Sequence, residues 1–112
     1  MITYETWKMR KAKIYVKGVE AGTLTEVRQG KEYLFEYIDG YEGLEVSRTM
    51  PKNVKVYKFD KFPPFFDGLL PEGIQLDGLL KIKKIDKNDH FSQLIAVGDD
   101  MVGAVTVKEI VE

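Results

Sequence analysis

The sequence predicts an α+β domain with a mostly antiparallel sheet and two or three short helices. The first observation is that β-type segments joined by short turn sequences fill residues 11–59, which is typical of a meander of hairpins. The second is that apolar residues recur at helical spacing over residues 63–97. An all-β fold is excluded because it leaves this second pattern unexplained. A final β-type run, residues 101–107, is expected to return to the sheet.

The strands of the first half are bounded by turn signals. Three β-type segments cover residues 11–16, 21–28 and 31–39, and the sequences KGVE and QG separate them. A further short strand is expected at residues 44–50, where Pro51 ends it. The spacing of Val54, Val56 and Phe59 predicts an edge strand or extended segment after it.

The helices of the second half begin after two consecutive prolines. Proline lacks the amide donor, so Pro63 and Pro64 can open a helix but cannot continue one. Large apolar residues at 65, 66, 69 and 70 follow at helical spacing, and the sequence PEG breaks that turn. A second helix is predicted over residues 74–85, where Gly78 weakens it by about 1 kcal/mol relative to alanine.

The third helix carries the clearest end signals. Asn88 or Asp89 is expected to be its N-cap, and apolar residues follow at i, i+3 and i+4. Gly98 is expected to end this helix in a left-handed conformation. One core is then expected to unite sheet and helices, formed by Phe35, Tyr37, Phe66, Leu70, Phe91, Leu94 and Val105.

Length and composition restrict the possible functions. The 112 residues allow one domain, which we assign to residues 13–108 after an extension at 1–12. A net charge of −1 offers no general basic field for nucleic acid. The absence of cysteine excludes disulfides, thiolate zinc sites and a cysteine nucleophile, and the single histidine, His90, argues against a histidine metal site. Without a long apolar run or a signal-peptide stretch, we expect no membrane partner and a cytoplasmic location.

Several candidate motifs lack the residues or the geometry that their chemistry requires. Gly98 and Gly103 have the spacing of a phosphate loop but lack the lysine and hydroxyl residue that must follow. Residues 86–90 resemble the start of a calcium loop, but Phe91 replaces its obligatory glycine. Asp99 and Asp100 are adjacent on a turn, whereas paired catalytic carboxylates must face one another. No cofactor and no catalytic residue is therefore predicted.

Trp7 and the apolar turn at residues 65–73 are the candidates for binding. An exposed tryptophan is a favoured interface anchor, although an indole can equally cover a sheet edge. Four large apolar residues within six positions exceed what one narrow helical stripe needs, but they can also all be core residues. The candidate partner-binding residues are Phe65, Phe66, Leu69, Leu70, Pro71, Glu72, Gly73 and Trp7.

The same turn carries a family resemblance. Its sequence FFDGLLPEG resembles the FF-x-N-L-L-P-E-G signature of the N-terminal subdomain of HipA-type serine/threonine kinases, with Gly68 in place of the usual Asn. Further segments agree in order, namely residues 16–18, 22–24, 35–37, 46–51, 89–94 and 98–105. The resemblance spans about residues 13–108.

This resemblance implies a binding module. The kinase core that binds ATP lies outside the family's N-terminal subdomain, so the chain is not expected to be an enzyme by itself. A free-standing subdomain resembles HipS, the small member of tripartite HipBST toxin–antitoxin systems. That resemblance implies that it binds and neutralises a HipT/HipA-like kinase, with a HipB-like DNA-binding protein in the same complex. The alternative is a structural or regulatory N-terminal domain of a longer HipA-type kinase.

Overall fold

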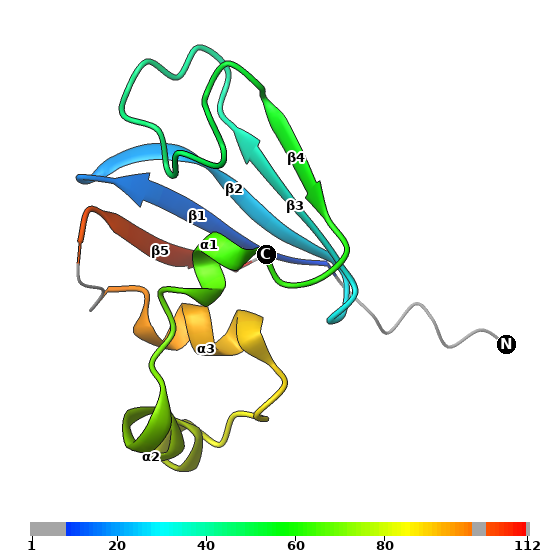
Figure 1. Ribbon diagram of the computed structural model, residues 1–112, viewed down its shortest axis with the longest axis vertical. Coiled ribbons are helices and arrows are strands. Elements are labelled where there is room, and N and C mark those ends of the chain that lie inside the picture. The colour runs from blue at the N-terminus through cyan, green and yellow to red at the C-terminus, as the bar shows by residue number, and fades with distance from the viewer. Residues whose placement is uncertain (1–8, 100–102, 112) are drawn as a thin grey trace, which may run out of the picture.

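The computed structural model describes residues 9–99 and 103–111 and confirms the α+β class. Its sheet has five strands in the order β4-β3-β2-β1-β5, and every neighbouring pair is antiparallel (Figure 1). The strands are β1 Arg10–Val16, β2 Val19–Arg28, β3 Glu32–Tyr37, β4 Val56–Phe59 and β5 Val105–Ile110. The predicted hairpin meander is therefore present, and β5 returns to pair with β1.

Three helices follow the sheet's first four strands in the chain. They are α1 Pro64–Asp67, α2 Gly73–Lys83 and α3 His90–Val97. Pro64 occupies the first turn of α1, as the missing amide donor requires. Asp89 is the N-cap of α3, where its side chain accepts a hydrogen bond from the Ser92 amide. None of these helices, within the described residues, is long and apolar enough to cross a membrane.

The core lies between one face of the sheet and helices α1 and α3. Side chains alternate along each strand, so β1 sends Ala12, Ile14 and Val16 to this face. Phe66 of α1 and Phe91 of α3 meet the sheet there, both fully buried. Six of the seven expected core residues are buried. Leu70 is the exception, since it is half-buried and packs against the core from outside.

The prediction of a strand at residues 44–50 is wrong. This segment is a loop whose only described pairing is an isolated bridge between Ser47 and Met50. Tyr37 holds it, because its hydroxyl donates to the Met50 carbonyl and accepts from the Val46 amide. Val46 and Met50 are buried. Their apolar character therefore anchors a loop to the core and does not reflect a strand.

The prediction of a left-handed conformation at Gly98 is also wrong. Gly98 has φ −56° and ψ −33°, which any residue can adopt. Its glycine is explained by packing, since a Cβ there would lie 2.1 Å from the carbonyl oxygen of Val107. The Gly98 carbonyl in turn accepts a hydrogen bond from the Val107 amide at 3.1 Å. Strand β5 begins at Val105, and residues 101 and 102 of the predicted final strand lie outside the described residues.

Candidate functional site

The apolar residues of the predicted binding turn face the protein interior to different extents. Phe66 is fully buried, and its ring centroid lies 6.1 Å from that of Phe35 on β3. Phe65 packs edge-on against Phe66 with centroids 5.1 Å apart and is half-buried. Leu69 and Leu70 are also half-buried against the core. This part of the turn fastens α1 to the sheet and leaves three side chains partly accessible.

The second part of the turn is accessible. Pro71 is half-buried, whereas Glu72 and Gly73 are exposed. Glu72 precedes α2 in an extended conformation, and its side chain makes no capping hydrogen bond. Gly73 has φ +60°, the left-handed region that favours glycine, at the sharp entry into α2. The turn therefore presents the exposed carboxylate of Glu72 beside partly covered apolar residues. Trp7, the other candidate for binding, lies outside the described residues.

Helix α2 continues this accessible surface. No residue of α2 is buried, and the side chains of Ile74 and Ile82 are 89% and 79% exposed. The sequence places both isoleucines in the general apolar pattern of the helix, and their exposure was not expected. Ile74, Gly78 and Ile82 recur every four residues and share one stripe, but Leu76 and Leu80 have the same spacing, so the sequence does not show which stripe is exposed.

A polar network, partly buried, connects strands β1, β2 and β3 to the start of helix α3. Glu26 is 1% exposed, and its Oε1 lies 2.6 Å from Arg10 Nη2. Its Oε2 accepts from the Tyr33 hydroxyl at 2.9 Å. Arg10 also reaches Asp89, with 2.9 Å between Nη2 and Oδ1. In the sequence Arg10 stands among Lys8, Lys11 and Lys13, and nothing local indicates this role because its partners are distant in the chain.

The pKa values of the network fit a structural cross-link. Burial by itself raises the pKa of Asp89, but hydrogen bonds from Arg10 and Ser92 outweigh it and lower that pKa. Burial raises the pKa of Tyr33, and its hydrogen bond to Glu26 raises it further. No buried side-chain nitrogen or oxygen of the described chain lacks a hydrogen-bond partner. The lowered pKa keeps Asp89 charged and the raised pKa keeps Tyr33 protonated near neutral pH, as suits a structural contact.

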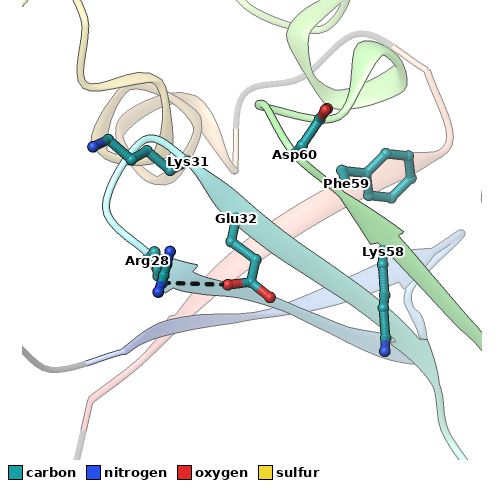
Figure 2. Close-up of a pocket in the computed structure, with 6 residues that line it drawn as sticks. All are labelled: Arg28, Lys31, Glu32, Lys58, Phe59 and Asp60. Atoms are coloured by element: carbon teal, nitrogen blue, oxygen red, sulfur yellow. Dashed lines mark ion pairs between the residues drawn. The ribbon is translucent and has the colours of Figure 1, made fainter.

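Charged side chains line a cleft beside the edge strand β4. One cleft lies at the β2–β3 turn and β4 and is lined by Arg28, Lys31, Glu32, Lys58, Phe59 and Asp60. Figure 2 shows Arg28 and Glu32 turned toward one another, and their Nε and Oε1 atoms are 3.7 Å apart. Lys58 points away from Lys31 and Asp60. Over the residues described, no cluster of His, Asp and Glu could hold a metal ion.

Comparisons with known proteins agree with this fold. The family model of the HipA N-terminal domain matches residues 12–108. A solved structure, the N-terminal domain of HipA toxin, has a TM-score of 0.72 and 29% identity, covering 92% of this chain and 94% of that one. An uncharacterized protein of Haemophilus influenzae (strain ATCC 51907 / DSM 11121 / KW20 / Rd) is 31% identical over 101 residues, 90% of this chain and 93% of that protein. The chain belongs to the HipA N-terminal domain family.

Proposed function

We propose that this chain is a non-catalytic, antitoxin-like module that binds a HipT/HipA-like serine/threonine kinase in the cytoplasm and neutralises it. The observation that carries the proposal is the nearly end-to-end match to the N-terminal domain of a HipA toxin. The match to the Haemophilus influenzae relative covers 93% of that protein. A chain formed almost entirely by this domain therefore exists there, which supports action as a separate subunit.

The proposed contact surface is the turn at residues 65–73, with Trp7 as a second anchor. Direct contact falls to its accessible part, which includes Glu72, Gly73 and the exposed edges of Phe65 and Leu69. Phe66 contributes indirectly, because its buried ring holds the turn in place. A standard interface buries about 800 Å² on each partner, so neighbouring elements must also take part.

A longer HipA-type kinase is the alternative setting for the same domain. The solved structure that it matches is described as a domain of the HipA toxin, which favours a regulatory or structural role beside a kinase core. The reading frame separates the two. A stop codon after Glu112 with a separate kinase gene supports the antitoxin module, and a frame that continues into a kinase core supports the alternative.

The test is a calorimetric titration of the cognate kinase with the wild-type chain, Glu72→Lys and Trp7→Ala. Glu42→Lys is the matched control, since Glu42 is exposed in the loop before β4. Loss of one aromatic anchor is expected to weaken binding by at least about 2 kcal/mol, roughly 30-fold. Glu72→Lys should weaken binding without lowering the unfolding temperature. Equal affinity for all variants places the interface elsewhere, and no binding by the wild type rejects the antitoxin role.

A kinase assay completes the test. The wild-type chain should lower substrate phosphorylation by the cognate kinase in proportion to the complex formed. The chain alone should transfer no labelled phosphate, because the sequence lacks a phosphate-loop lysine and the acidic residues that hold magnesium in kinases. Co-purification with a HipB-like DNA-binding protein is the corresponding test for the third subunit. Phosphate transfer by the isolated chain contradicts the proposal.

A further inference from the structure

Helix α2 carries an apolar stripe that the described chain leaves uncovered. Ile74, Gly78 and Ile82 lie one above another at four-residue intervals, on the same side of the helix. The two isoleucines are 89% and 79% exposed, more than any other large apolar residue described apart from Val111 near the C-terminus. A Cβ added at Gly78 would meet no atom within 4 Å. The stripe is therefore two aliphatic ridges separated by a gap at Gly78.

The opposite side of α2 accounts for its packing within the domain. Leu76, Leu79 and Leu80 lie on that side at helical spacing and are half-buried. The helix packs against α3, and Figure 1 shows α3 between α2 and the sheet. The isoleucine stripe consequently faces away from the contact that positions the helix. Fold stability does not explain its apolar character.

Positive charge gathers at the C-terminal end of the stripe. Lys81, Lys83 and Lys84 are exposed, and none has an ion pair among the described residues. Lysines at a helix C-terminus also offset the helix dipole, so they do not by themselves indicate a partner. Because they flank Ile82, however, any partner surface that covers the stripe must also accommodate their positive charge. Its rim must be acidic where these lysines meet it.

We propose that α2 docks through Ile74, Gly78 and Ile82 into an apolar groove of the HipA-type kinase, with acidic side chains at the end that receives Lys81, Lys83 and Lys84. A helix that lays apolar residues of one face into a hydrophobic groove is an established recognition mode. The inference rests on the proposed function, since it assigns the chemistry of the kinase surface. The stripe also continues the turn at residues 65–73, because Gly73 directly precedes Ile74.

Titration of the cognate kinase with the double variant Ile74→Gln/Ile82→Gln tests the stripe. The expected loss of affinity is at least about 30-fold, as for the loss of interface anchors. Leu44→Gln is the matched control, because Leu44 is 56% exposed in a different part of the domain. It should leave the affinity within about twofold of the wild type, the scatter expected of a peripheral position. Circular dichroism and the unfolding temperature should be unchanged in both variants.

Gly78→Gln separates docking from helix stability. Glutamine forms helices better than glycine and meets no neighbouring atom here, so α2 should become more stable. The added side chain fills the gap between the ridges, so kinase binding should nevertheless weaken about tenfold or more. Charge reversal of Lys81, Lys83 and Lys84 to Glu should weaken binding and invert its dependence on salt, because salt then screens repulsion from the acidic rim. The Ile74→Gln/Ile82→Gln variant should retain the salt dependence of the wild type.

The outcomes distinguish this inference from the proposed function. If the wild type binds the kinase and the double isoleucine variant binds equally well, the docking role of α2 is wrong while the proposed function stands. If the wild type does not bind, the proposed function itself fails. Sedimentation of the chain without the kinase tests whether the stripe instead binds a second copy of the chain. Self-association that the double isoleucine variant abolishes, with kinase binding intact, assigns the stripe to a second copy and overturns the inference.

Discussion

Arg10 and Asp89 stand 79 positions apart in the chain, and their side chains join the first strand to the last helix. Arg10 Nη2 lies 2.9 Å from Oδ1 of Asp89, and Nη1 lies 3.4 Å from Oδ2. The same carboxylate accepts from the amide and hydroxyl of Ser92 and so caps α3. The Asp89 side chain thus caps the N-terminus of α3 and also links this helix to strand β1.

Replacing Asp89 by alanine is expected to lower the free energy of unfolding by about 2 kcal/mol. Loss of an N-cap contributes about 1 kcal/mol, and loss of hydrogen bonds to a charged partner contributes a similar amount. Asp89→Asn should lose less, because its amide oxygen can still cap the helix. Urea unfolding measures both variants. A double-mutant cycle with Arg10→Met should give a coupling of at least about 0.5 kcal/mol, and strict additivity contradicts the cross-link.

The stability contributed by Asp89 is expected to disappear in acid. Its pKa is lower in the folded chain, where hydrogen bonds from Arg10 and Ser92 overcome the opposite effect of burial. The unfolded carboxyl titrates near about 3.9, so the contribution is present above that pH and is lost as pH falls through the lower folded value. Urea unfolding between about pH 7 and pH 3 should show a smaller decline for Asp89→Asn than for the wild type. Parallel curves contradict this assignment.

Phe91→Ala is expected to lower the free energy of unfolding by about 3–5 kcal/mol. Phe91 is 1% exposed, and the guanidinium carbon of Arg10 lies 5.0 Å from its ring centroid. The substitution removes core contacts and opens a cavity where α3 meets the sheet. Phe65→Ala is the comparison, because half-burial of Phe65 predicts a smaller loss. Equal losses in the two variants contradict a core centred on Phe91.

The sheet and helices were predictable because their signals are local. Alternation, turn residues and the proline pair each act within a few positions, and they specify three strands and the start of α1 correctly. The loop at residues 44–50 was not predictable in this way. Its conformation depends on the hydroxyl of Tyr37, nine residues before Val46 and on a different element. Gly98 likewise owes its identity to Val107, a contact that local spacing does not contain.

The candidate site was predictable only in outline. The signature at residues 65–73 identifies the family and makes this turn a candidate for binding, but it does not indicate which of its side chains are buried. Periodicity shows two apolar stripes on α2 without indicating which one packs against α3. Leu76, Leu79 and Leu80 are half-buried in the structure, whereas Ile74 and Ile82 are exposed. Which stripe of α2 faces inward depends on tertiary packing, which local periodicity does not contain.

Two glycines of the second half are expected to respond in opposite directions to the same substitution. Gly98→Ala should lower the free energy of unfolding by about 1–3 kcal/mol, because the new Cβ would lie 2.1 Å from the Val107 carbonyl oxygen and must displace β5 or α3. Gly78→Ala should raise it by up to about 1 kcal/mol, because α2 gains helix propensity and the Cβ meets open space. Urea unfolding of both variants under one set of conditions makes the comparison. Stabilisation by Gly98→Ala would show that backbone freedom, and not the approach of β5, explains that glycine.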